Sequence, residues 1–219
     1  FGMSRRKTSF SLLLVIFALI SINIFLAFIR TTLFSLYLYN NSIEQRQLEN
    51  AVKIMSNVND LEEKIEKSVS LFKEGYNCSQ SVVAAFAEDY GFTREQALKM
   101  SASFGGGIGR MRETCGAACG LFMLAGLETG AVEGSDKEEK AANYALVQEL
   151  AEEFKRRNGA LKCAELLGLS NKEPIVSTPE ARTSQYYAKR PCVKMVEEAA
   201  KIWSDYLKNK DISIKNQKK

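Results

Sequence analysis

Apolar residues recur three and four positions apart through most of this 219-residue chain, and no stretch alternates polar and apolar residues as a half-buried strand would. From residue 61 to residue 206 this periodicity predicts successive helices, each with an apolar face that a neighbour must cover. The expected fold is therefore all-α, a compact helical bundle of about six or seven helices.

Capping residues and glycines predict where several of these helices begin and end. Thr93 with Gln96 and Ser135 with Glu138 form the capping-box pattern of a helix start. Three glycines are expected to follow the last residues of helices: Gly75, Gly91 and Gly159. The polar stretch 169–180 predicts a loop, and the following helix is expected to open at Pro191.

The spacing also predicts which faces of three helices are buried. The first is expected to bury Leu61, Ile65, Val69 and Phe72. A long helix ending at Asn158 is expected to bury Tyr144, Val147, Ala151 and Phe154. The last helix is expected to bury Val196, Ala199, Trp203 and Tyr206 on the face that also carries Cys192.

The N-terminal part of the chain has a different composition. Residues 11–29 are apolar over about the length that a helix needs to cross a bilayer, and Arg5, Arg6 and Lys7 precede them. Because basic residues favour the cytoplasmic side, this pattern predicts a single-pass membrane anchor with its N-terminus in the cytoplasm.

A second interpretation places the start of translation at Met55, with a helix opening at an Asn59 or Asp60 cap. The hydrophobic segment 1–54 would then be an upstream extension of the reading frame, and the four-cysteine helical domain 55–219 would be cytoplasmic. A membrane partner is expected only under the first interpretation.

Charge and residue types exclude several classes of function. The chain contains no histidine, which excludes Ser-His and Cys-His triads and histidine-ligated zinc. The net charge of +4 comes from residues 1–55, which hold six basic and two acidic side chains. Since the remainder is neutral, no nucleic-acid partner is expected, and the chemistry falls to cysteines and the other polar residues.

The cysteines are the strongest candidates for that chemistry. There are five, with no Cys-x-x-Cys pair, and an odd number argues against a purely structural disulfide framework. Four lie at or near predicted helix N-termini, where free N–H groups and the helix dipole stabilise a thiolate: Cys78, Cys115, Cys163 and Cys192. We expect these four to converge, with Cys115 as the reactive thiolate and Cys119, one turn further on, backing it up or simply packing.

The segment FGGGIGRMRETCGAACG, residues 104–120, surrounds this cysteine with glycine. It lacks the Lys-Ser or Lys-Thr ending of a phosphate-binding loop and no strand precedes it, so no nucleotide is expected. Four glycines are expected to leave the backbone open beside Cys115: Gly105, Gly106, Gly107 and Gly109. Gly116 and Gly120 would allow close helix contact, and Arg110, more than Arg112, would bring positive charge to the sulfur.

Several segments together resemble a known family. They are NCSQSV at 77–82, FGGGIGRM at 104–111, CGAACG at 115–120, Cys163 before ELLG, and Cys192 near a C-terminal helix. In this order they resemble the C-GCAxxG-C-C family of redox-active proteins over about residues 60–207. The resemblance implies that Cys78, Cys115, Cys163 and Cys192 are the four cysteines of the family name. Gly116, Ala117 and Gly120 match its central motif, whereas Cys119 occupies a variable position.

Three functions remain open. The four thiolates could be the metal ligands of an iron-sulfur cluster or, with less support, of another centre such as zinc, serving electron transfer to an unidentified redox partner. Alternatively, Cys115 attacks a disulfide and Cys78, Cys163 or Cys192 resolves the product, as in a thiol-disulfide oxidoreductase or redox sensor. The third is a non-catalytic helical module with structural zinc or packed cysteines.

Overall fold

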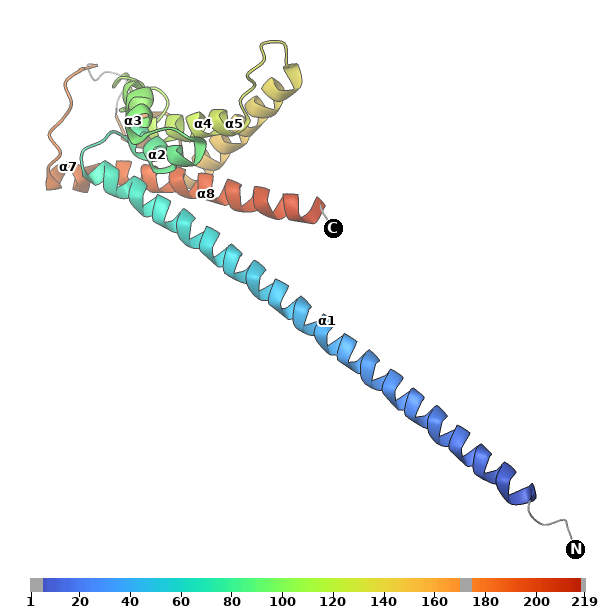
Figure 1. Cartoon of the computed structure of the whole chain (residues 1–219). Coiled ribbons are helices and arrows are strands. Elements are labelled where there is room, and N and C mark those ends of the chain that lie inside the picture. The colour runs from blue at the N-terminus through green and yellow to red at the C-terminus, as the bar shows by residue number, and fades with distance from the viewer. Residues whose placement is uncertain (1–5, 170–174, 218–219) are drawn as a thin grey trace, which may run out of the picture. The chain divides into compact units, whose positions relative to one another are not determined.

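The computed structural model describes residues 6–169 and 175–217, and the side chains of 28–49, 51–169, 175–210, 212 and 213. In this part of the chain the predicted all-α fold is confirmed, with eight α-helices, two short 3-10 helices and no strand (Figure 1). The chain divides into two compact units, residues 1–56 and residues 57–219.

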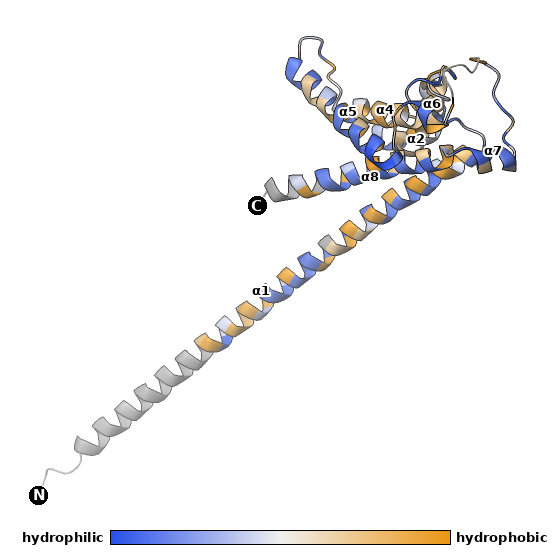
Figure 2. Ribbon diagram, turned by 180° about the vertical axis from the view of Figure 1, so that it is seen from behind, coloured by the Kyte–Doolittle hydropathy of each residue, from blue (hydrophilic) through white to orange (hydrophobic). Residues whose placement is uncertain are grey.

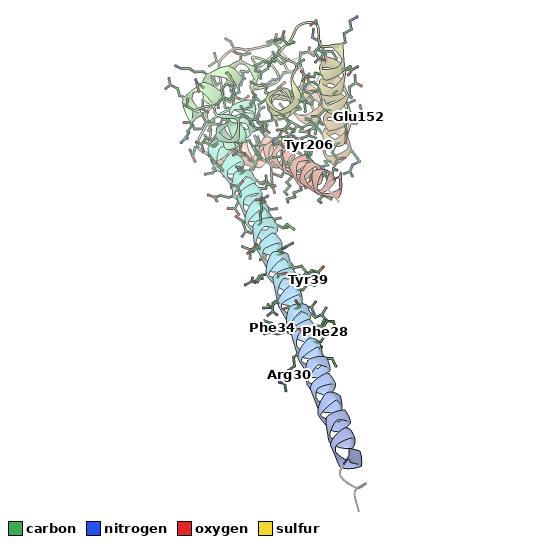
Figure 3. All side chains as sticks on the ribbon, turned by 45° about the vertical axis from the view of Figure 1, so that its right-hand side comes forward. Phe28, Arg30, Phe34, Tyr39, Glu152 and Tyr206 are labelled. Carbon is green, nitrogen blue, oxygen red and sulfur yellow. The ribbon has the colours of Figure 1, made fainter. Side chains whose placement is uncertain are left out.

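The first unit is helical from Arg6 onward, within a helix, α1, that is bounded by Arg6 and Lys73. Large apolar side chains along it are exposed, among them Phe28, Phe34 and Tyr39, which stand out from the ribbon in Figure 3. Most of the predicted membrane span, residues 11–27, lies outside the described side chains. Where side chains are described, no helix combines the length and the hydropathy that a membrane crossing requires.

The predicted helix start at Asn59 or Asp60 is wrong, because α1 runs through both residues. No glycine or proline occurs between residues 3 and 74, so nothing in this stretch stops a helix from propagating. The end of the helix follows the prediction, since α1 stops at Lys73 and Gly75 has a φ of 108°.

The second unit is organised around α4 (Gly116–Thr129), which contacts α2 (Cys78–Phe86), α5 (Lys137–Asn158) and α8 (Cys192–Gln217). Figure 2 shows hydrophobic colours along α4 and more hydrophilic ones on α5. The remaining elements are the 3-10 helices at Ala87–Tyr90 and Ala102–Phe104, and α3 (Arg94–Ser101), α6 (Cys163–Leu166) and α7 (Ser184–Lys189). The core is fully buried at Phe86, Leu121 and Trp203.

The predicted helix caps are confirmed at one site and shifted at another. Thr93 and Gln96 form a capping box at the start of α3. The start of α5 is capped by Asp136, whose side chain accepts a hydrogen bond from the backbone N–H of Glu139, so the predicted Ser135 and Glu138 box is one residue early. Asp and Ser are equally good caps, and periodicity alone does not choose between neighbouring ones.

The predicted inward face is confirmed for α8 and partly wrong for α5. In α8 the predicted Val196, Ala199 and Trp203 are fully buried. In α5 the buried residues are Leu146, Leu150 and Phe154, whereas Tyr144 is 62% exposed. Tyr144 lies roughly 200° around the helix from Leu146, so both cannot face the core. The short helix α7, which Thr183 caps, is not predicted by the sequence pattern.

The contact between α2 and α4 provides a test of the packing. A Cβ added to Gly120 would lie 2.9 Å from Val82 Cβ and 3.1 Å from Ser79 O, whereas one added to Gly126 meets nothing within 4 Å. We expect Gly120→Ala to lower the free energy of unfolding by about 1–3 kcal/mol through overpacking. Gly126→Ala in the same helix should raise it by about 0.5–1 kcal/mol through helix propensity. Denaturant unfolding of both variants measures this, and equal effects would contradict the described contact.

Candidate functional site

The four predicted cysteines lie at helix N-termini, as the sequence indicates. Cys78, Cys163 and Cys192 are the first residues of α2, α6 and α8, and Cys115 is the residue that precedes α4. Local capping fixes the first of these positions, because Asn77 and Gln80 form a capping box around Cys78.

These four cysteines line one cavity of about 250 Å³. The predicted convergence is therefore confirmed, although the cysteines are up to 114 positions apart in the sequence. Cys78, Cys115 and Cys163 are buried and Cys192 is partly buried, and all four are free thiols. Cys119 is also buried but does not line the cavity, and its Sγ lies 3.7 Å from the backbone oxygen of Thr114.

Glycines allow the cysteine-bearing segments to approach one another. A Cβ on Gly116 would lie 3.2 Å from Cys78 Cβ, and one on Gly107 would lie 2.6 Å from Cys163 Cβ. A Cβ on Gly105 would lie 2.4 Å from the side chain of Asn77, the residue that caps α2. The glycines therefore do more than leave space beside Cys115, since they bring Cys78 and Cys163 to it.

The backbone between Phe104 and Cys115 has an unusual left-handed conformation. Five consecutive residues have positive φ, from Gly106 at 66° to Arg110 at 66°, and Arg112 follows at 64°. Ile108, at 56°, is β-branched, and such residues are rarely found there. The turn is held by hydrogen bonds from Ile108 N to Phe104 O at 3.2 Å and from Gly109 N to Ser103 O at 2.7 Å.

A short backbone pairing fixes Cys115 beside Cys163. Thr114 and Lys162 form an isolated antiparallel bridge. Next to it, Cys115 N donates to Leu161 O at 2.9 Å and Cys163 N donates to Glu113 O at 2.7 Å. The start of α4 and the start of α6 are therefore joined through the main chain.

Four arginines share the cavity with the cysteines. Arg110 and, with less weight, Arg112 were expected from the sequence to bring positive charge there, whereas Arg182 and Arg190 were not. Glu180 also lines the cavity and pairs with Arg190, and its Oε1 lies 3.5 Å from Arg110 and 4.0 Å from Arg112. Arg190 stands two residues before Cys192, which is the one sequence signal that could have found it.

Cys192, rather than Cys115, has the lowered thiol pKa. A hydrogen bond with the Cys78 thiol, helped by Arg190, Arg182 and Arg112, outweighs burial and lowers the pKa of Cys192 to about 7. The same pairing, together with burial, raises the pKa of Cys78 well above its usual range. Near neutral pH Cys192 is therefore partly ionised, whereas Cys78 keeps its proton.

Burial has the opposite effect on the remaining cysteines. It raises the pKa of Cys115 to about 12, although the N–H groups of Ala117 and Ala118 approach the sulfur without completing a capping hydrogen bond. It also raises the pKa of Cys163, despite the hydrogen bond from Arg112, and that of Cys119 to about 11. The helix N-terminus alone does not overcome desolvation here.

The predicted metal centre would need several donor side chains that lie close together. Among the residues that the structure describes, no three or more cysteine, aspartate or glutamate side chains stand together as the ligands of one ion. The four thiols in their described positions do not fit the tetrahedral sulfur set that zinc or an iron-sulfur site requires.

The difference between Cys192 and Cys115 can be tested by titration. We expect the Cys192 thiolate to form with a midpoint near pH 7. The rate of alkylation by iodoacetamide, measured at several pH values and assigned to Cys192 by peptide mapping, gives this midpoint. Since this pKa lies below the unfolded value of about 9, the ionisation stabilises the reduced fold above pH 9, and the gain is lost as the pH falls through 7.

Cys78→Ala should move the midpoint of Cys192 to higher pH, because it removes the hydrogen bond that stabilises the thiolate. Cys119→Ala is the matched control, since Cys119 is outside the cavity and should leave the midpoint unchanged. An equal shift of the Cys192 midpoint in the two variants would contradict the interaction between Cys78 and Cys192.

Comparison with known proteins supports the grouping of these cysteines. The family model described as "Putative redox-active protein (C_GCAxxG_C_C)" matches residues 76–206, which is more than half of the chain and contains all four cavity cysteines. No curated protein and no solved structure matches the chain. The chain belongs to the C_GCAxxG_C_C family.

Proposed function

We propose that this protein is a thiol-disulfide redox protein in which Cys192 is the attacking thiolate and Cys78 the resolving thiol. The observation that carries the proposal is that Cys78 and Cys192 line one cavity with the remaining two family cysteines. The interaction with the Cys78 thiol, which lowers the pKa of Cys192, supports the assignment of roles. An attacking thiol reacts fastest when its pKa lies near the ambient pH, which is the position of Cys192 and not of Cys115.

The proposed reaction balances with a disulfide as the oxidant. The Cys192 thiolate attacks one sulfur of the substrate, a mixed disulfide forms, and the other sulfur leaves as a thiolate. The Cys78 sulfur then attacks Cys192 Sγ, its proton passes to the second leaving thiolate, and a Cys78–Cys192 disulfide forms. Two protein thiols lose two electrons and one substrate disulfide gains them, and the reverse reaction oxidises substrate thiols.

The other two functions differ from this one in measurable ways. Stoichiometric iron and sulfide in anoxically purified protein would support the iron-sulfur alternative and overturn the dithiol reaction. A structural role predicts that cysteine substitutions change the free energy of unfolding without any specific disulfide forming.

The roles of the two thiols can be separated by trapping. Treatment of the reduced full chain with 2-hydroxyethyl disulfide should give an intramolecular Cys78–Cys192 disulfide, detected by peptide mapping. Cys78→Ser should stop the reaction at a mixed disulfide on Cys192, because the resolving thiol is gone. Cys192→Ser should abolish both products.

Cys119→Ser serves as the control and should give the same disulfide as the unmodified chain, since Cys119 does not line the cavity. A mixed disulfide that accumulates on Cys115 in the Cys78→Ser variant would instead assign the attack to Cys115.

A further inference from the structure

The cavity beside Cys192 is strongly cationic. Four guanidinium groups line it, from Arg110, Arg112, Arg182 and Arg190, whereas Glu180 supplies the only carboxylate among its described lining residues. The Cys192 thiolate adds one further negative charge, so the positive charges still exceed the negative ones by two. A cavity lined by one sign of charge concentrates ions of the opposite sign.

Arg182 is held so that part of its guanidinium lacks a hydrogen-bond acceptor among the side chains and backbone that the structure describes. Its guanidinium carbon lies 4.5 Å from the ring centroid of Phe72 and 4.7 Å from that of Tyr186, and one terminal nitrogen donates to Tyr76 O at 3.3 Å. The other terminal nitrogen, Nη1, is buried without a hydrogen-bond partner among the described residues. A buried N–H of a charged group without an acceptor is costly, and Arg182 also lines the cavity, where its charge favours an anionic ligand.

The remaining arginines are only partly satisfied by Glu180. This carboxylate is shared by Arg190, Arg110 and Arg112, and the side chain of Glu180 is itself 45% exposed. Arg110 uses its Nε to donate to Val176 O at 2.7 Å. A guanidinium offers five donors in a fixed fork that matches a carboxylate, so three arginines around one carboxylate leave donors free for a second.

The geometry points to small carboxylate-bearing disulfides as the substrates of this site, with the arginines binding the carboxylate while the Cys192 thiolate reaches the disulfide. This inference rests on the proposed function, and it adds the chemical class of the substrate. The cavity volume of about 250 Å³ lies below the range usual for drug-sized ligands, which favours a small molecule. The electron balance is that of the proposed reaction, in which the disulfide is reduced to two carboxylate-bearing thiols.

Three disulfides of similar size and different charge test the inference on the reduced full chain. They are 3,3'-dithiodipropionate, which is anionic, 2-hydroxyethyl disulfide, which is neutral, and cystamine, which is cationic. For each reagent, the rate at which it forms the Cys78–Cys192 disulfide is divided by the rate at which it reacts with 2-mercaptoethanol. This division corrects for the intrinsic reactivity of the three disulfides. We expect the anionic reagent to exceed the cationic one by about tenfold or more, and added salt to reduce the ratio.

Arg182→Gln and Arg190→Gln should each lower this anionic preference several-fold, while Arg182→Lys should restore part of it by keeping the charge. Arg94→Gln is the matched control, because Arg94 also lies over a ring, 5.5 Å from the centroid of Tyr76, but does not line the cavity. The same preference in all four variants would overturn the inference.

The failure of the inference and the failure of the proposed function give different results. Normalised rates that are equal for the three reagents, or highest for cystamine, would overturn the anionic substrate class and leave the dithiol reaction intact. If no reagent forms the Cys78–Cys192 disulfide, the proposed function fails. The rate of Cys192 alkylation by anionic iodoacetate, divided by the rate with neutral iodoacetamide, then decides whether the cavity attracts anions. If this ratio is no higher than the same ratio for 2-mercaptoethanol, the attraction of anions is overturned too.

Discussion

The site depends on a close approach of main chain that only glycine permits. Residues 104–116 lie against the start of α2 and the start of α6, and side chains at Gly105, Gly107 or Gly116 would collide with Asn77, Cys163 or the oxygen of Phe104. Because two of these neighbours are Cys163 and Asn77, the residue that caps the helix beginning at Cys78, the approach also determines how near the thiols come. Without it the four helix N-termini would have no common cavity.

The left-handed turn beside this contact has a cost that the rest of the fold must offset. Each non-glycine residue in that conformation costs roughly 1–2 kcal/mol, and Ile108, Arg110 and Arg112 all adopt it. The pairing of Thr114 with Lys162 and the burial of α4 are the local features that hold the segment in place. Two of the strained residues are arginines that line the cavity, so the strain coincides with the site's positive charge.

The sequence predicts local features of this protein better than it predicts their electrostatic balance. Caps such as Thr93 and the helix-start positions of the cysteines follow from short-range patterns, and the periodicity of α8 correctly places Trp203 inside. The sequence did not predict that the lowered thiol pKa would fall on Cys192 and not on Cys115, because a thiol pKa depends on depth of burial and on charges distant in sequence. Arg182, for example, reaches the site from 104 positions beyond Cys78, and no local pattern marks it.

Under the proposed function, the charge of the cavity links the oxidation of Cys78 and Cys192 to the binding of a carboxylate. In the reduced state the Cys192 thiolate, which forms as the pH rises through about 7, carries a negative charge that offsets part of the charge of the four arginines. Formation of the disulfide removes that negative charge, so the oxidised cavity is more positive and binds an anion more tightly. Binding equilibria are reciprocal, and a bound carboxylate must therefore stabilise the disulfide and lower its reduction potential. Release of the reduced anionic product is therefore slowest while the Cys78–Cys192 disulfide persists.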